Sequence, residues 1–282
     1  QLFFGLTIAL VALYYTLRNV SFSEVTDSFK EMDYIYIIPA IVIIILSYVF
    51  RAYRWQALLE SSLKVNVSGL YSPMMVGFMG NFLPARAAEL LRPYLLSKKH
   101  DITFSAAFAS IIMERLFDLM MILLIFIWVF WFEASVFSAD VKFSGFSVQE
   151  IAIKFGQLCV LAVGAFVVFI YLLLNHKKMM IKLVHWFTGF MNEKWRNKIK
   201  WFVDEFAVGC EVVKKFGALV KISVYSVLVW VGNIFWVYPL YYAFDLQYKT
   251  IPSLLVLAVM VSILITVVPT PGFLGSYNAG IF

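Results

Sequence analysis

The stretch GNFLPARAAELLRP, residues 80–93, places three charged side chains between apolar segments. Arg86, Glu89 and Arg92 follow one another at steps of three residues, so a helix would carry them on one side. Arginine is the preferred donor for bidentate recognition of phosphate and carboxylate groups. Asn81 adds a neutral donor to the same stretch. These residue types at this spacing predict a polar site that accepts an anionic group.

A second charged stretch, MERLFD at 113–118, lies within the apolar segment 104–132. Glu114 comes roughly 15 Å along a helix that begins with this segment, near the middle of a bilayer. Glu114 and Asp118 share a helix face, and Arg115 is placed to pair with Asp118. Each charge that faced lipid would cost roughly 2.5 to 3.5 kcal/mol. We therefore expect the two charged stretches to neutralise each other across a protected cavity.

Two other uses of these charges stay open. One is an architectural network of ion pairs that holds a broken helix in place. The other is an integral-membrane enzyme acting on lipid phosphates, which needs an acidic metal-binding cluster or a histidine as acid and base. His100, His176 and His185 fall in loops or surface helices, and an arginine between the two carboxylates of the second stretch disfavours bound Mg²⁺. We expect no catalytic residue, metal or cofactor.

The composition predicts a polytopic, all-α membrane protein. The 282 residues are 62% hydrophobic and 14% charged, with a mean hydropathy of +0.86, whereas soluble domains carry about 25% charged residues. Cys159 and Cys210 predict free thiols rather than a disulfide framework. We expect a single transmembrane domain over 1–282, cut from a longer polypeptide because the chain stops within an apolar pattern. A helix crosses the hydrocarbon with about 20 residues, and long apolar segments recur at about 2–17, 35–55, 104–132, 151–174 and 218–243.

Charged loops predict which side of a cell membrane each segment faces. Segment 175–217 contains nine Lys and Arg residues, whereas acidic residues dominate 18–34. The positive-inside rule places 175–217 and the N-terminus in the cytoplasm and 18–34 outside. The 175–217 segment also predicts a basic amphipathic helix, which would lie on an anionic membrane surface or pack on the protein's own cytoplasmic face. Its apolar stripe consists of Trp195, Ile199, Phe202, Phe206, Cys210 and Val213.

The orientation predicts that 70–97 enters the membrane from the cytoplasm and returns, because a full crossing would invert every later segment. Gly80 is a weak helix former and Pro84 lacks a backbone donor, so both suit the tip of a hairpin of two half-helices. A second break, VVPTPGFLGSYNAG at 267–280, indicates either a second re-entrant hairpin or an ordinary Pro-Gly turn. Two hairpins of opposite entry would form an inverted repeat around a midplane site. The hinge residues of the second would be Pro269, Pro271, Gly272 and Gly275.

Arg51 and Arg54 belong to RAYRW (51–55), which ends the apolar segment 35–55. Long basic side chains near the end of a membrane helix commonly extend toward the interface. We expect both arginines to do so.

These motifs together resemble the flippase-like family typified by the transmembrane region of lysylphosphatidylglycerol synthase. The resemblance runs over nearly the whole chain and rests on FMGNFLPARAAELLRPYLLSKK, ASIIMERLFDL, RAYRW and PTPGFLGSYNAG. It implies a polytopic protein linked to moving lipids or lipid-linked headgroups across the membrane. This sequence departs from the family at the late motif, which in the family reads P-G-G-x-G followed by a Glu. Here Phe273 replaces the second glycine, and Asn278 stands near the position of the Glu. The missing Glu disfavours proton coupling through a second buried carboxylate. The resemblance extends to Asn81, Pro84, Arg86, Glu89, Arg92, Glu114, Arg115, Asp118, Pro271, Gly272 and Gly275.

The expected function is a lipid transporter, or flippase, with membrane lipids as its partners. The substrate would be an anionic phospholipid or a polyprenyl-phosphate-linked lipid, because arginines line the predicted site. A non-transporting scaffold that docks a partner on 175–217 is a third alternative, although a scaffold has no need of buried charges. Nucleic acid is not expected as a partner, because the positive-inside loops account for the net charge of +6. Homo-oligomerisation stays open.

Overall fold

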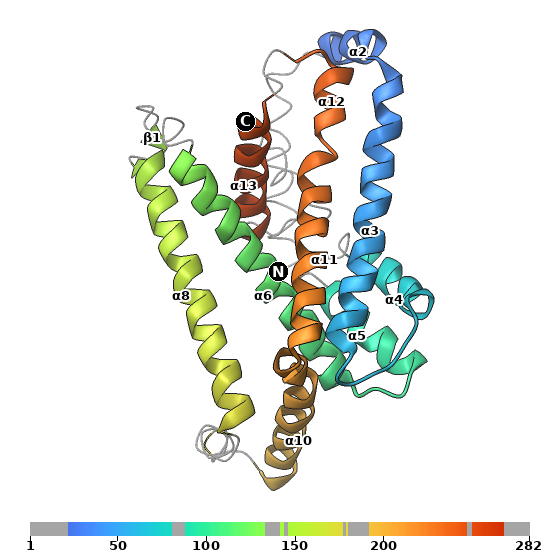
Figure 1. Cartoon of the computed structure of the whole chain (residues 1–282), viewed down its shortest axis with the longest axis vertical. Helices are drawn as coiled ribbons and strands as arrows, with labels where there is room; N and C mark the ends of the chain where they lie inside the picture. Colours follow the sequence, from blue (N-terminus) through green and yellow to red (C-terminus); the bar gives the residue numbers. More distant parts are fainter. Residues whose placement is uncertain are drawn as a thin grey trace.

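The computed structural model describes residues 22–80, 88–132, 142–143, 146–176, 179, 192–246 and 250–267. These residues form helices and one antiparallel pair of two-residue strands (Figure 1). The predicted helical architecture is therefore confirmed in its coarse form. In chain order the elements are α2 (Phe22–Glu31), η1 (Tyr34–Tyr36), α3 (Ile37–Leu59), α4 (Val67–Met79), α5 (Ala88–Lys99), α6 (Phe104–Phe132), β1 (Lys142–Phe143), β2 (Phe146–Ser147), α8 (Val148–Asn175), α10 (Glu193–Cys210), η4 (Glu211–Lys214), α11 (Phe216–Phe235), α12 (Tyr238–Ala243) and α13 (Ile251–Val267).

Two helical stretches among the described residues, Tyr34–Leu59 and Phe216–Ala243, are long and apolar enough to cross a membrane. Shorter apolar stretches lie in α8 and α13. In α3 the exposed residues Ile38, Ile41 and Ile45 recur every three or four positions, so they line one face of the helix. An exposed aliphatic face of this kind suits contact with lipid chains.

α3 and α11 run side by side (Figure 1). A glycine permits their close approach, because a Cβ atom at Gly232 would lie 2.8 Å from the Cβ of Ser47. Asn233 follows on α11, and its Oδ1 accepts hydrogen bonds from Ser47 Oγ at 3.4 Å and from Arg51 Nη2 at 2.8 Å. Small and polar residues therefore form this part of the contact between the two apolar helices.

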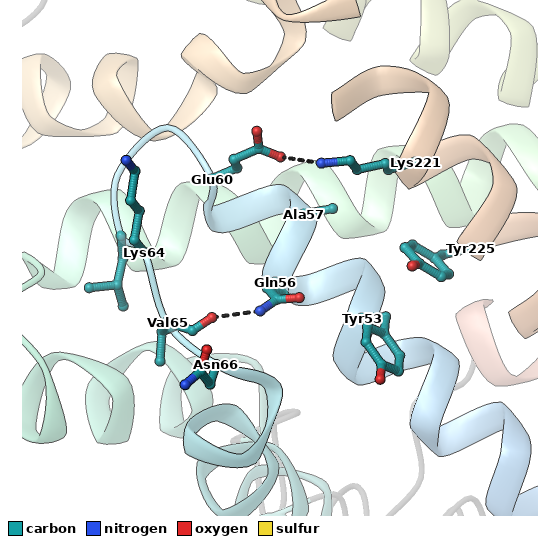
Figure 2. A pocket seen from close by; sticks show the side chains of 10 residues that line it. Tyr53, Gln56, Ala57, Glu60, Lys64, Val65, Asn66, Lys221 and Tyr225 are labelled. Carbon is teal, nitrogen blue, oxygen red and sulfur yellow. Dashed lines mark hydrogen bonds and ion pairs between the residues drawn. The ribbon is translucent and has the colours of Figure 1, made fainter. Parts of the chain in front are cut away.

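The end of α3, the loop 60–66 and the beginning of α11 surround a pocket (Figure 2). Gln56 Nε2 donates to the carbonyl oxygen of Val65 at 2.7 Å, which ties the loop back onto α3. The Glu60 carboxylate lies 3.4 Å from Lys221 Nζ of α11. The loop is thus held by contacts to both helices.

α4 and α5 form an antiparallel pair. The start of α4 and the end of α5 lie together, next to the beginning of α6. Lys99 Nζ at the end of α5 donates to the carbonyl oxygen of Gly69 near the start of α4, at 3.2 Å. Gly80 ends α4 and is buried, and its backbone N–H contacts the carbonyl oxygens of Gly77 and Phe78. The arrangement suits two half-helices, but their entry into the membrane stays a prediction.

Several predicted features lie outside the described residues, so the second hairpin and the inverted repeat stay predictions. They are the apolar segment 2–17, the site residues Asn81 and Arg86, the tip residue Pro84, and the hinge residues Pro269, Pro271, Gly272 and Gly275.

α10 packs against the first turns of α6, at the end of the molecule opposite α2 (Figure 1). A Cβ atom at Gly209 would lie 2.5 Å from the Cβ of Ala109, so only glycine allows this approach. The rings of Phe202 and Phe108 lie 6.5 Å apart. Trp195, at the start of the helix, is 53% exposed. The later part of the predicted apolar stripe therefore packs on the protein itself.

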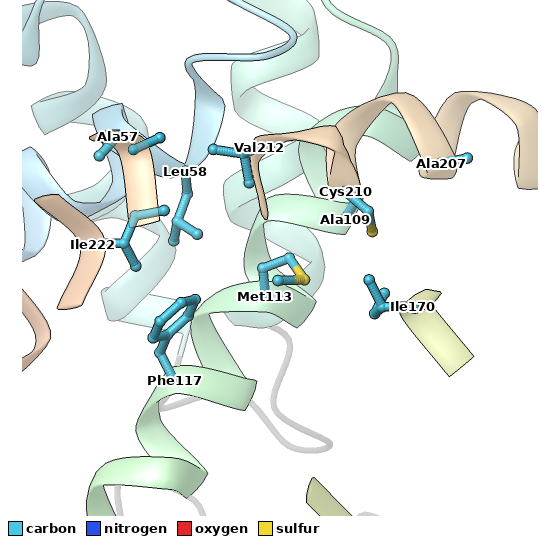
Figure 3. Packing of buried hydrophobic residues seen from close by; sticks show 11 residues of the cluster. Ala57, Leu58, Ala109, Met113, Phe117, Ile170, Ala207, Cys210, Val212 and Ile222 are labelled. Atoms are coloured by element: carbon cyan, nitrogen blue, oxygen red, sulfur yellow. The ribbon is translucent and has the colours of Figure 1, made fainter. Parts of the chain in front are cut away.

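Apolar residues from α3, α6, α8, α10, η4 and α11 meet in a core beside this contact (Figure 3). Met113 and Phe117 supply one face of α6 to it, and these residues immediately precede Glu114 and Asp118. α6 thus presents an apolar face to this core and its carboxylates to the neighbouring side. The other members are Ala57, Leu58, Ala109, Ile170, Ala207, Cys210, Val212, Ala218 and Ile222.

Candidate functional site

Glu114 lies at the centre of a buried cluster of ion pairs. Its side chain is 1% exposed and contacts arginines from two other helices. Arg54 of α3 donates from Nη2 to Oε1 at 3.0 Å. Arg92 of α5 donates from Nη1 to Oε1 at 3.2 Å and from Nη2 to Oε2 at 2.9 Å, which is the bidentate geometry that arginine and carboxylate prefer. One carboxylate of α6 therefore joins α3, α5 and α6. We call Arg54, Arg92 and Glu114 the inner triad.

Asp118, one turn farther along α6, joins α11 to the same cluster. Its Oδ1 accepts from Arg54 Nη1 at 2.7 Å and from Trp230 Nε1 at 3.2 Å. Arg54 Nη1 also lies 3.5 Å from Ser226 Oγ. The charged residues of α3 and α6 thus contact α11 through an indole and a hydroxyl group.

Arg115 and Glu89 form the accessible edge of the cluster, which we call the rim. Arg115 Nε lies 3.5 Å from Glu89 Oε1, and the two side chains are 43% and 33% exposed. Arg115 Nη1 also lies 3.3 Å from Asp118 Oδ2. The cluster therefore has an enclosed part and a part that a ligand can reach.

Packing determines the position of Arg92. Its guanidinium group lies over the rings of Trp55, at 4.5 Å, and Phe78, at 5.1 Å. Trp55 is held in turn, because its Nε1 donates to Ser110 Oγ at 3.0 Å. A Cβ atom at Gly77 would lie 2.1 Å from Arg92 Cγ. The path of Arg92 toward Glu114 is thus lined by α3 and α4, and α6 holds Trp55 in place.

Arg51, one turn before Arg54, lies beside the cluster with a neutral partner. Its Nη2 donates to Asn233 Oδ1 at 2.8 Å, and its guanidinium lies 5.7 Å from the centre of the Phe78 ring. Among the described residues no carboxylate lies within ion-pair distance of it. The described part of the site contains four arginines and three carboxylates, so its net charge is one positive charge. Its charged residues are Arg51, Arg54, Arg92, Arg115, Glu89, Glu114 and Asp118.

The structure brings together five of the predicted site residues, namely Glu89, Arg92, Glu114, Arg115 and Asp118. Arg115 and Asp118, which their three-residue spacing predicted to pair, are in contact. Asn81 and Arg86 lie outside the described residues. That these residues bind a substrate stays a prediction.

The interpretation of Arg54 as an interfacial anchor is wrong. Its side chain is 0% exposed and contacts both Glu114 and Asp118. An inward position is favoured because two carboxylates one turn apart would otherwise be buried without enough partners. The sequence signal is the two carboxylates one turn apart at 114 and 118, which a single arginine of another helix can contact together, as Arg54 does.

A metal centre finds no support in the described part of the chain. No group of three or more His, Cys, Asp or Glu side chains there could hold a metal ion. Two donors of the inner triad, Arg54 Nε and Arg92 Nε, are buried without a hydrogen-bond partner. The chemistry of the site is therefore that of guanidinium and carboxylate groups.

Long apolar helices around buried ion pairs suit a helical membrane protein, in which charged side chains face protein or water rather than lipid. The family model for the lysylphosphatidylglycerol synthase TM region matches residues 2–282, and the chain belongs to this family. The resemblance inferred from the motifs is thus confirmed.

The chain is also similar to a curated protein, Glycosyltransferase AglD of Haloferax volcanii. The two are 29% identical over 120 residues, which are 42% of this chain and 19% of that protein. The match thus spans about a fifth of the relative's length. No solved structure matches the chain. The family and the relative together indicate a lipid-related membrane protein.

Proposed function

We propose that the protein is a lipid transporter that moves an anionic lipid or lipid-linked headgroup across a cell membrane. The charged cluster of α3, α5, α6 and α11 would be its transport site. The observation that carries this proposal is the excess positive charge of the described part of the cluster, where the direct contacts of Arg51 are with the neutral groups Asn233 and Phe78. A phosphate group would supply the missing anion and two or more acceptor oxygens for guanidinium donors.

The inner triad and the rim would have different roles in this mechanism. Arg54 and Arg92 are enclosed and already share Glu114, so they would position the helices rather than meet the lipid first. Arg115 is 43% exposed and its contacts with Glu89 and Asp118 are longer, at 3.5 and 3.3 Å. A headgroup phosphate would therefore first contact Arg115 and then Arg51, with Arg86 of the neighbouring stretch as a further donor.

Movement would come from the α4–α5 pair, which is held to α6 by the Arg92–Glu114 contact. Two buried Nε donors, of Arg54 and Arg92, have no hydrogen-bond partner in the described part of the chain, and an unsatisfied donor costs about 1–3 kcal/mol. Re-entrant hairpins hinged at Gly80, Pro84 and the 269–275 motif would expose the site alternately to the two sides.

Transbilayer movement of labelled lipids in proteoliposomes tests this proposal. Wild type would be compared with Arg115→Gln and Arg51→Gln, using phosphatidylglycerol, a polyprenyl phosphate and the neutral-headgroup lipid phosphatidylcholine. Arg196→Gln is the matched control, because Arg196 forms a surface pair with Glu193 on α10.

We expect wild type and the control to move the anionic lipids, and each site variant to move them at least tenfold more slowly. Equal rates for folded site variants and wild type would overturn the proposal. So would equal movement of the neutral and anionic lipids.

An enzyme acting on lipid phosphates is the second candidate, and the observation that favours it is the name of the matched relative, a glycosyltransferase. The matched part is 19% of that protein, so its activity need not extend to this chain. Incubation of the proteoliposomes with lipid phosphates, with and without a chelator, separates the two candidates. Product formation that the chelator abolishes would favour the enzyme. Movement of lipids to the other leaflet without any change in their chemical structure would favour transport.

A further inference from the structure

The pocket at the end of α3 is separate from the charged cluster and has a composition of its own (Figure 2). Its volume is about 490 Å³, within the range of sites that hold a small organic molecule and larger than a single phosphate requires. The side chains that matter here are Tyr53, Gln56, Lys64, Asn66, Lys221 and Tyr225.

Two tyrosines stack on each other and form the aromatic surface of this pocket. The rings of Tyr53 on α3 and Tyr225 on α11 lie 5.6 Å apart at an interplanar angle of 19°. Tyr53 remains 40% exposed, so part of this surface is available to a ligand. The faces of aromatic rings carry partial negative charge and attract the polarised C–H groups of a sugar ring.

Several hydrogen-bonding groups of the pocket are unused within the described part of the chain. The hydroxyl groups of Tyr53 and Tyr225 and the side-chain amide of Asn66 have no partner there. Gln56 donates to Val65 through Nε2 and keeps its Oε1 available. Neutral donors and acceptors beside an aromatic face are the groups that recognise the hydroxyls of a carbohydrate.

Two lysines of the pocket lining, Lys64 of the loop and Lys221 of α11, add positive charge (Figure 2). Lys64 has no carboxylate partner among the described residues, and Lys221 is 3.4 Å from Glu60 and 58% exposed. Lysine binds phosphate as a point charge. The combination of an aromatic face, neutral polar groups and lysines therefore matches a sugar joined to a phosphate.

The position of the pocket favours a lipid as the source of that group. The apolar stretch of α3 ends at Leu59, and the pocket is lined by its last turns and by the loop that follows. A headgroup occupies this depth at the membrane interface. The pocket and the charged cluster share two helices, because Tyr53 and Tyr225 immediately precede Arg54 and Ser226, which contact each other at 3.5 Å.

We propose that this pocket binds the phosphosugar headgroup of a polyprenyl lipid. As a statement about the transported substrate, this inference rests on the proposed transport function. As a statement about binding, it stands on the pocket alone. Tyr53 and Tyr225 would contact the sugar ring, Gln56 and Asn66 its hydroxyls, and Lys64 the phosphate.

Native mass spectrometry of the purified protein with defined ligands tests the proposal. The ligands are a polyprenyl phosphate mannose, the same polyprenyl phosphate without the sugar, and free mannose 1-phosphate. The variants are Tyr225→Ala and Lys64→Gln, with Tyr71→Ala as control, because Tyr71 on α4 is similarly exposed, at 43%, and outside the pocket. Thermal unfolding would verify that each variant is folded.

We expect wild type and the control to bind the mannosylated lipid at least tenfold more tightly than the bare polyprenyl phosphate. Tyr225→Ala should abolish this preference. Lys64→Gln should weaken the binding of both lipids several-fold and leave the preference for the mannosylated lipid unchanged. Equal affinities for the two lipids in wild type, or an unchanged preference in Tyr225→Ala, would overturn the proposal. Free mannose 1-phosphate that binds as tightly as the lipid would show a soluble ligand instead.

A transport assay on the same preparations separates this inference from the transport function. If the sugar preference is present but no lipid moves, the pocket is a binding site and the transport proposal fails. If lipids move but the sugar gives no advantage in binding, transport stands and the pocket proposal fails.

Discussion

Gly77 on α4 and Arg92 on α5 fit together so closely that a methyl group on Gly77 would lie 2.1 Å from Arg92 Cγ. The guanidinium at the other end of the same side chain contacts Glu114 through two hydrogen bonds. The packing of α4 on α5 therefore determines whether the inner triad can form.

Gly77→Ala should displace Arg92 and weaken its contact with Glu114. Overpacking in a close contact costs about 1–3 kcal/mol, so we expect a lower midpoint of thermal unfolding in detergent. Gly164→Ala on α8 is the matched control, because a Cβ atom there has nothing within 4 Å and alanine favours a helix. Equal midpoints for Gly77→Ala and wild type would show that Arg92 can move away at little cost.

Glu114→Gln should destabilise the fold more than any single change at the surface. It leaves Arg54 and Arg92 buried without the charge they share, and loss of one partner from a buried ion pair costs about 3–5 kcal/mol. Thermal unfolding again measures the effect. The surface variant Glu193→Gln, whose side chain is 87% exposed, should keep the wild-type midpoint. Similar shifts for the two variants would contradict the enclosed geometry of the inner triad.

Cys210 should resist alkylation in the folded protein. The thiol is buried between α10 and α6, and burial raises its pKa from 9.0 to about 12. The unfolded chain loses this proton first, so the contribution of Cys210 to stability should fall as pH rises from 9 toward 12. Maleimide labelling followed by mass spectrometry should show modification of Cys210 at pH 8 only after a denaturant is added. Fast labelling without denaturant would show that the contact of α10 with α6 opens in solution.

The predicted orientation places α10 in the cytoplasm and α2 outside, and these two helices lie at opposite ends of the molecule (Figure 1). Lys200→Cys on α10 and Glu31→Cys on α2 introduce thiols at exposed positions of each. In intact cells a membrane-impermeant maleimide should label the α2 position and not the α10 position, and inverted vesicles should give the opposite result. Labelling of both positions in intact cells would contradict the predicted topology.

The family and the need for buried ion pairs follow from the sequence itself. Three charges within six residues of an apolar helix must find partners or water, because lipid contact is costly at each position. The spacing of Arg115 and Asp118 predicts their contact correctly, since residues three apart on a helix are neighbours. The helical architecture follows for the same kind of reason, from the length of the apolar segments.

Only the tertiary structure decides which cation Glu114 meets. Arg54 precedes Glu114 by 60 residues, and near the end of a membrane helix an arginine can either reach the interface or turn inward. The choice depends on how α3 is rotated against α6 and α11, which is set by contacts such as Trp55 with Ser110 and Ser47 with Gly232. Such packing depends on the shapes of several helices at once, and no spacing within one helix records it. The sequence therefore determines that the charges are paired, and the packing of α3, α5 and α11 around α6 determines the partners.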